Sequence, residues 1–347
     1  MNIVARSSLF AAVFAVVSAT SLAVPAAHAD DMRLTGAGGT FPFPIYSAWF
    51  KQFSDKTPGI QVDYQGVGSG AGIQAFINHT VDFGASDAAM TDEQIAKVKQ
   101  GVVLLPMTAG TIVLGYNLPG NPKGLKLPRD VYPEIFLGKI TSWKDPKIVA
   151  ANPGMQLPDL PITVVTRSDA SGTNFVFTKH LSAVDPAFAK QVGFGTTVPW
   201  PSSAKFVGAP KNDGVAATIK QTPGAIGFVE YGYALFTNMT SALLQNKAGN
   251  YIEATAKSGE AALASAKLGP DLRGWVDEPS GADSYPIATF TWLLLYKQQD
   301  PKKAKILQEM VDFCAKDSSQ AMAEKMGYIP LPPNIIEKVK AAVATIK

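Results

Sequence analysis

The stretch Thr166–Phe175 holds the residue types best suited to bind a ligand. Arg167 offers a planar fork of donors that matches a tetrahedral oxyanion, and Asp169 follows where it could hold that guanidinium in place. Ser171 suits the N-cap of a helix, whose unpaired N–H groups and partial positive charge favour an anion. These residues predict anion binding, although an Arg–Asp surface pair beside an ordinary capped helix would give the same pattern.

Two glycine-rich turns earlier in the chain offer similar chemistry. Residues 36–42 separate a short strand from apolar residues at helical spacing, and Thr40 stands where that helix should begin. Residues 66–72 repeat the order strand, glycine turn, helix, with Ser69 at the turn. Glycines let the backbone come close to a ligand, and the following helix N-terminus favours an anion. Two tight turns without a ligand are the alternative.

Asp87 ends a third strand and turn, at 81–88. One interpretation is that it caps the helix expected at Thr91–Val98. A sharper one is that its carboxylate accepts a hydrogen bond from the P–OH of hydrogen phosphate, whereas fully ionised sulfate has no proton to offer. Asp87 and the run 66–72 also fit a loose dinucleotide-binding pattern. We rank that pattern lower because it leaves the other turns without a role.

The first residues and the composition indicate an exported protein. Residues 1–29 combine a basic start, an apolar run and Ala27-His28-Ala29, which predicts a signal peptide and a periplasmic location. The single cysteine is Cys314, so we expect neither a lipid anchor near the cleavage site nor an internal disulfide. The chain has 31 Lys and Arg residues against 28 Asp and Glu, a balance that argues against a nucleic-acid partner.

The remaining length suits two domains of α/β class. A strand at 111–117 precedes a passage rich in proline, glycine and lysine, and a strand at 286–296 returns. We therefore predict a lobe I formed by 30–115 plus 287–347 and a lobe II formed by 116–286. Helical periodicity also predicts helices at 260–268, 304–323 and 335–346, of which we expect the last two to pack on lobe I.

In combination these stretches resemble the PstS family of periplasmic phosphate-binding proteins, which serve ATP-driven phosphate importers. The motifs that carry the resemblance follow the family's order and occupy 34–42, 64–70, 81–88, 168–173 and 223–231. The resemblance implies a two-lobed type II periplasmic binding protein fold. Each lobe would be a mixed sheet flanked by helices, with crossover strands as the hinge and phosphate in the cleft between the lobes.

The resemblance also implies which residues contact phosphate. They are Thr40, Phe41, Ser69, Asp87, Arg167, Ser171, Gly172 and Thr173, with Asp169 pairing with Arg167 behind them. Gly70 and Ala170 depart from the pattern, because many relatives have Ser and Gly there. The implied partners are inorganic phosphate, as HPO4 or H2PO4, and the membrane permease subunits of the importer. We expect a monomer with no cofactor and no metal.

The function predicted is binding and delivery of phosphate without catalysis. An exported hydrolase is the chief alternative, with Ser171 as a nucleophile, but neither His79 nor His180 lies in a stretch that resembles a catalytic motif. A metal phosphatase would need clustered His and Asp ligands, and the sequence has no such cluster. An adhesin or scaffold that kept the fold would have no anion affinity.

Overall fold

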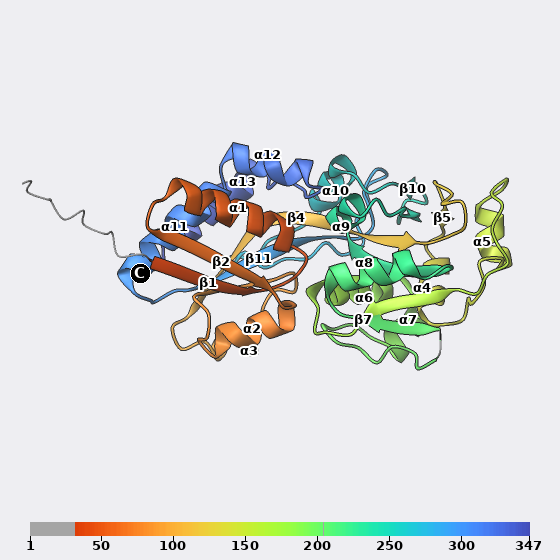
Figure 1. Cartoon of the computed structure of the whole chain (residues 1–347), viewed down its shortest axis with the longest axis horizontal. Helices are drawn as coiled ribbons and strands as arrows, with labels where there is room; N and C mark the ends of the chain where they lie inside the picture. The colour runs from red at the N-terminus through yellow and green to blue at the C-terminus, as the bar shows by residue number, and fades with distance from the viewer. Residues whose placement is uncertain (1–31, 204) are drawn as a thin grey trace, which may run out of the picture.

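The molecule is elongated, and its elements form two groups along the long axis (Figure 1). The structure is a computed structural model that describes residues 32–203 and 205–347. The predicted signal peptide, 1–29, therefore lies outside the described residues. Within those ranges, no helix is both long enough and apolar enough to cross a bilayer.

One mixed sheet runs through both groups. Its strands are β1 Met32–Gly38, β2 Ile60–Gly66, β3 Phe83–Ser86, β4 Val102–Tyr116, β6 Thr163–Arg167, β7 Phe206–Ala209, β8 Ala225–Glu230 and β11 Ala288–Tyr296. Their order is β2-β1-β3-β11-β4-β8-β6-β7. β1 is parallel to β2 and β3, and β6 is parallel to β7 and β8. We call the part around β1–β3 lobe I and the part around β6–β8 lobe II; the antiparallel strands β4 and β11 join them.

Helices flank the sheet in both lobes, and some of them supply the crossover connections that parallel strands require. In lobe I they are α1 Phe43–Lys56, α2 Ser69–Ile77, α3 Asp92–Ala96, α11 Pro301–Cys314, α12 Asp317–Lys325 and α13 Pro333–Val343. In lobe II they are α4 Val131–Phe136, α5 Pro146–Ala151, α6 Gly172–Val184, α7 Pro186–Gln191, α8 Lys211–Gln221 and α9 Tyr231–Phe236. α10, Ala256–Leu263, packs against β4 and β11. A small sheet of β5 Lys126–Leu127, β9 Leu243–Gln245 and β10 Tyr251–Ile252 lies at the far end of lobe II (Figure 1).

β4 is longer than the strand predicted at 111–117, because it begins at Val102. Its first part pairs with β11, and from Ile112 onward it pairs with β8. Pro106 hides the first part from a pattern-based prediction, since proline cannot donate a ladder hydrogen bond. The structure accommodates Pro106 at an irregularity, where the register with β11 shifts between Thr291 and Trp292.

Two predicted helices differ in extent from the observed ones. The run predicted at 304–323 is two helices, because α11 ends at Cys314 and α12 begins at Asp317. The run predicted at 260–268 begins earlier and ends at Leu263, since Thr255 and Ser258 form a capping box that starts α10 at Ala256. The C-terminal helices pack on lobe I as expected; Trp49 Nε1 of α1 donates to the carbonyl of Ser319, 2.9 Å away.

Each lobe has an aromatic cluster of its own. In lobe I, Phe50 of α1 meets Phe83 of β3 edge to face, with ring centroids 5.4 Å apart. In lobe II, Phe177 of α6 stacks on Phe228 of β8 at 4.3 Å. Each cluster packs helices onto its own part of the sheet, and the buried residues of β4 and β11 connect the two into one continuous core.

Candidate functional site

Polar residues gather where the two lobes meet. In lobe I, β1, β2 and β3 are parallel, or joined through parallel neighbours, so their carboxyl ends lie at one edge of the sheet. Thr40, Ser69 and Asp87 follow those three strand ends. In lobe II, Arg167 ends β6, and α6 begins at Gly172. The predicted contacts with polar side chains are buried: Thr40 is 3% exposed, Ser69 0%, Asp87 1%, Arg167 5%, Ser171 1% and Thr173 0%.

Arg167 is a buried cation whose guanidinium group is only partly hydrogen-bonded. Its Nε and Nη2 donate to the two carboxylate oxygens of Asp169, at 2.8 and 2.6 Å. Burial would raise the pKa of Asp169, but the hydrogen bonds and charge of Arg167 hold it below its ordinary value. Arg167 Nη1 is buried and has no hydrogen-bond partner among the described residues. A buried charged donor without a partner is costly, so this atom calls for an anion.

Asp87 faces Arg167 from the other lobe. Its Oδ1 accepts from Thr291 Oγ1 at 2.9 Å, and Ser69 Oγ lies 3.4 Å from its Oδ2. Burial raises the pKa of Asp87 to about 7, although the hydroxyl of Thr291, the charge of Arg167 and the hydroxyl of Ser69 each lower it. Near neutral pH this carboxyl can therefore accept a hydrogen bond when it is ionised and donate one when it is protonated.

Asp87 does not cap the helix that follows it. Thr91 does so, in a capping box with Gln94: the Thr91 hydroxyl accepts from Gln94 N–H, and the Gln94 side chain accepts from Thr91 N–H. The capping interpretation of Asp87 was therefore wrong. Since Thr91 satisfies the start of α3, the Asp87 carboxyl is left to face the cleft.

The first turn of α6 lies close to Ser69 and Asp87 of lobe I. Ser171 is the N-cap, as predicted, and its Oγ accepts from Asn174 N–H at 3.0 Å. The N–H groups of Gly172 and Thr173 have no partner within the helix. A Cβ on Gly172 would lie 2.4 Å from Ser69 Oγ and 2.7 Å from Asp87 Oδ2. Only a glycine lets the two lobes approach this closely.

The turn after β1 meets lobe II through Thr40. α1 begins at Phe43 with Pro42 as N-cap, so Thr40 precedes the helix instead of starting it. The Thr40 hydroxyl is held across the cleft by Asn212 Nδ2 at 3.0 Å, with Arg167 Nη2 at 3.5 Å. Phe41 buries its ring 6.2 Å from that of Tyr328. Phe41 can therefore offer the cleft only its backbone.

Sequence reasoning missed three residues of this site. Asn212 contacts Thr40 and Thr173, Tyr233 Oη donates to the Thr40 carbonyl at 2.6 Å, and Thr291 bonds to Asp87. Asn212 stands two residues before Gly214 and resembles an ordinary helix start, and Thr291 lies inside an apolar strand. Both acquire their roles from the fold, because Thr40 is 172 residues from Asn212 in sequence and Asp87 is 204 residues from Thr291.

A hollow leads from the surface to Thr40. It has a volume of about 630 Å³ and is lined from lobe I by Phe43 and Tyr64 and from lobe II by Lys211 and Tyr233. Thr40 is the one predicted phosphate contact among the residues that line it.

The glycine turn of the dinucleotide-binding pattern is covered by lobe II. Gly70 N–H donates to the Ala170 carbonyl at 3.0 Å, and a Cβ on Gly70 would lie 2.4 Å from that of Ala170. A Cβ on Gly68 would lie 2.7 Å from Asp169 Oδ2. With the lobes in contact, a pyrophosphate has no space to approach this backbone, which argues against that alternative.

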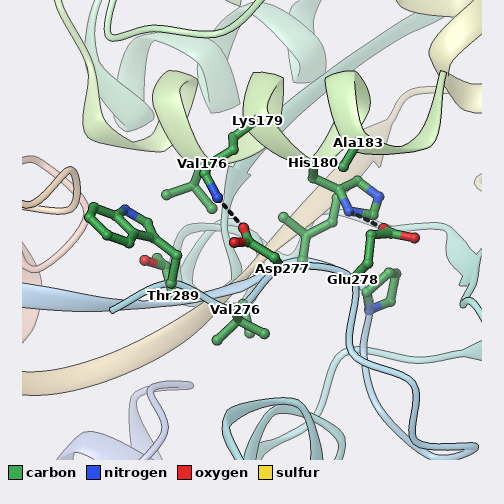
Figure 2. A pocket seen from close by; sticks show the side chains of 12 residues that line it. Val176, Lys179, His180, Ala183, Val276, Asp277, Glu278 and Thr289 are labelled. Atoms are coloured by element: carbon green, nitrogen blue, oxygen red, sulfur yellow. Dashed lines mark hydrogen bonds and ion pairs between the residues drawn. The ribbon is translucent and has the colours of Figure 1, made fainter. Parts of the chain in front are cut away.

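The two histidines of the hydrolase alternative are engaged elsewhere. His180 Nε2 shares a hydrogen bond with Tyr132 Oη at 2.7 Å, and its Nδ1 lies 2.9 Å from Glu278 Oε1. Figure 2 shows His180 and Glu278 in a small pocket between α6 and the stretch that leads into β11. The ring of His79 packs on Tyr296. Among residues 32–203 and 205–347, no group of three His, Cys, Asp or Glu residues could hold a metal ion.

The chain is similar to known proteins in sequence and in fold. A family model for the PBP superfamily domain matches residues 23–318. The phosphate-binding protein PstS of Pasteurella multocida is 38% identical over 340 residues, which cover 97% of this chain and 94% of that protein. The PstS of Xylella fastidiosa is 36% identical over 328 residues, covering 93% and 88%.

A solved periplasmic phosphate-binding protein with bound phosphate aligns with a TM-score of 0.73 at 22% identity, covering 89% of this chain and 93% of that one. This likeness confirms the predicted two-lobed type II fold. With the sequence relatives, which match nearly the whole chain, it agrees with the resemblance drawn from the five motifs. The chain belongs to the PstS family of phosphate-binding proteins, within the PBP superfamily.

Proposed function

We propose that this protein binds inorganic phosphate in the cleft between its lobes and delivers it to the membrane permease of an ATP-driven importer. The single observation that carries the proposal is the buried, unpartnered Nη1 of Arg167. Nη2 of the same guanidinium lies 3.5 Å from the buried Thr40 hydroxyl, and Arg167 ends the strand that precedes α6. These groups are donors suited to a small tetrahedral anion, and the relatives of the chain are named as phosphate-binding proteins.

Each predicted contact has a role in this proposal. Phosphate would accept from Arg167 and from the backbone N–H groups of Phe41, Gly172 and Thr173. The side-chain hydroxyls would donate to it as well; they belong to Thr40, Ser69, Ser171 and Thr173. Asp169 holds the guanidinium in place through two hydrogen bonds. The chemistry is binding alone, with no covalent step and no cofactor.

Asp87 would supply selectivity. Its carboxylate accepts the proton of a P–OH group, so hydrogen phosphate completes a hydrogen bond at this position. Fully ionised sulfate would place an unprotonated oxygen against the carboxylate, and the two negative groups would repel each other. The site therefore distinguishes two anions of similar shape by the presence of a proton.

Delivery requires that the lobes open and close. We propose that 30–115 plus 287–347 and 116–286 move as the two bodies, with β4 and β11 as the hinge. The change of partner of β4 between Thr111 and Ile112 supports a hinge near Gly115 and Ile287. The closed monomer, exported to the periplasm through a cleaved signal peptide, would then be recognised by the permease.

Titration calorimetry tests the proposal on protein that has been unfolded, freed of phosphate and refolded. We expect tight binding of one phosphate per chain, which excess sulfate leaves intact. Absence of phosphate binding, or equal binding of sulfate, would contradict the proposal. An assay with a chromogenic phosphomonoester tests the hydrolase alternative, and turnover that depends on Ser171 would favour it.

A further inference from the structure

Asn212 joins two predicted phosphate contacts that come from opposite lobes. It lies in the first turn of α8 and is fully buried. Its Nδ2 donates to Thr40 Oγ1 of lobe I at 3.0 Å and to Thr173 Oγ1 of lobe II at 3.4 Å. Its backbone N–H also points to Thr40 Oγ1, at 3.3 Å. No other side chain in the described ranges bonds to both hydroxyls.

The orientation of the Asn212 amide is fixed by its other end. The Oδ1 accepts from the backbone N–H of Glu230 at 3.1 Å. An NH2 group could not accept that hydrogen bond, so the nitrogen must face the two threonines. Asn212 is therefore a donor to both hydroxyl oxygens and cannot accept a proton from either.

This donor role determines where the hydroxyl protons go. A threonine hydroxyl has one proton to donate and lone pairs to accept. Thr40 Oγ1 and Thr173 Oγ1 accept from Asn212, and neither donates to another group among the described residues. Both protons are therefore available to an acceptor in the cleft. Tyr233 fixes the backbone beside Thr40, since its Oη donates to the Thr40 carbonyl at 2.6 Å.

We infer that Asn212 is a positioning residue for phosphate binding. It occupies the acceptor side of the Thr40 and Thr173 hydroxyls, so that both protons point at the anion, and it links the lobes when they close on it. The inference rests on the proposed function, because it requires phosphate in the cleft. Asn212 itself does not contact the phosphate.

The test measures phosphate affinity by calorimetry for four proteins: wild type, Asn212→Ala, Thr173→Val and the double variant. We expect Asn212→Ala to weaken binding about tenfold to a hundredfold, as the loss of several ordered hydrogen bonds would. Because Asn212 acts through the hydroxyls, Thr173→Val should cost the Asn212→Ala protein clearly less than it costs wild type. A purely structural role for Asn212 predicts equal costs.

Asn246 provides the matched control. It is also a fully buried asparagine of lobe II, and its Nδ2 donates to the backbone carbonyls of Gly281, Ala282 and Ser284, away from the cleft. Asn246→Ala should lower the melting temperature but change the phosphate Kd by no more than about twofold, since it removes hydrogen bonds without touching the site.

The outcomes separate this inference from the proposed function. If wild type does not bind phosphate, the proposed function fails. If wild type binds and Asn212→Ala binds within threefold of it, or if the two single losses are additive, the inference is overturned. Should Asn212→Ala not fold, Asn212→Asp keeps the shape and the acceptor for Glu230. Its second oxygen would attract both hydroxyl protons, so phosphate binding should be lost, and retained binding would overturn the inference.

Discussion

The two lobes build their halves of the cleft from the same local structure but give them opposite charge. In both, a strand ends at the sheet edge and a helix N-terminus follows. The charged group in the lobe I half is the carboxyl of Asp87, whereas the lobe II half contributes the guanidinium of Arg167. In the proposed function, Arg167 of lobe II contributes affinity for the anion, and Asp87 of lobe I selects an anion that carries a proton.

The charges of Arg167 and Asp87 also differ in how strongly they depend on pH. Arg167 is held by two hydrogen bonds to Asp169, and a guanidinium stays charged at any ordinary pH. Asp87 has a pKa raised to about 7 by burial, so its charge changes near neutral pH. We therefore expect changes in lobe II to alter affinity at all pH values, and changes in lobe I to alter selectivity in a pH-dependent way.

Removing the lobe II charge should have the largest effect. Arg167→Ala leaves the anion in a buried site without its counter-charge, and breaking a buried charge pair costs enough to weaken phosphate binding about a hundredfold to a thousandfold. Arg167→Lys should recover only part of this, because an ammonium lacks the planar fork that bonds Asp169 and the ligand together. Calorimetry at constant pH measures both.

Arg129 is the control for this prediction. Its Nε donates to Glu278 Oε2 at 3.0 Å in lobe II, away from the predicted contacts. Arg129→Ala should leave phosphate binding near the wild-type value. If Arg167→Ala bound phosphate as well as Arg129→Ala did, lobe II would not be the source of affinity.

The contact between the lobes at Gly70 offers the next largest effect. Gly70→Ser places a side chain where Ala170 already lies, since even a Cβ would come within 2.4 Å of the Ala170 Cβ. Overpacking of this kind hinders closure and should weaken phosphate binding about fivefold to a hundredfold. Adding Ala170→Gly should restore most of the affinity. Calorimetry on the single and double variants decides, and failure of the second change to rescue the first would show that closure does not bring these residues together.

Asp87→Asn should alter selectivity more than affinity. The amide can donate to an unprotonated oxygen, so sulfate should bind measurably, while phosphate should bind about tenfold less tightly because it loses a charged acceptor. For wild type, sulfate should compete better at pH 5 than at pH 8, since the carboxyl with a pKa of about 7 is then protonated and can donate. Competition calorimetry at both pH values checks this, and sulfate excluded from Asp87→Asn would refute the assigned role.

The same residue predicts a change in stability. Its pKa of about 7 lies above its ordinary value of 3.8, so the ligand-free folded state binds the proton more tightly than the unfolded state does. Its contribution to stability is therefore full below pH 3.8 and is lost as the pH rises to about 7. Ligand-free Asp87→Asn should gain melting temperature relative to wild type across this range. Asp82→Asn, in the same lobe but bonded to Thr35 and Lys303, should show no such gain.

The sequence was sufficient for the parts of the site that a short pattern encodes. Ser171 is followed by an apolar helical run, so its place as the N-cap could be read directly, and the structure confirms it. Thr40 was placed at a helix start, yet α1 begins only at Phe43 because Pro42 takes the N-cap position. The pattern thus located the turn but missed the boundary, which depends on local backbone geometry.

Contacts between distant segments were beyond the sequence. Thr291 sits among apolar residues of a buried strand, and only the pairing of β11 with β3 brings its hydroxyl to Asp87. Asn212 resembles a helix cap, and only the approach of the two lobes brings it to Thr40. Both residues are supports for predicted contacts, so one sequence without the fold cannot distinguish them from ordinary polar residues.

Asp169→Asn should have the smallest effect, and its size tests how the lobe II charge is held. The amide keeps an acceptor for Arg167 but loses the negative charge, in a side chain that is 20% exposed, so we expect phosphate binding to weaken only about threefold. Asp63→Asn, which breaks the exposed pair with Arg33 in lobe I, is the matched control and should have no effect on calorimetric affinity. A loss as large as that of Arg167→Ala would mean that the guanidinium reaches the anion only when Asp169 orders it. The contribution of lobe II to phosphate affinity would then depend on Arg167 and Asp169 together. Lobe II would differ from lobe I in how rigidly its charged group is held, as well as in the sign of its charge.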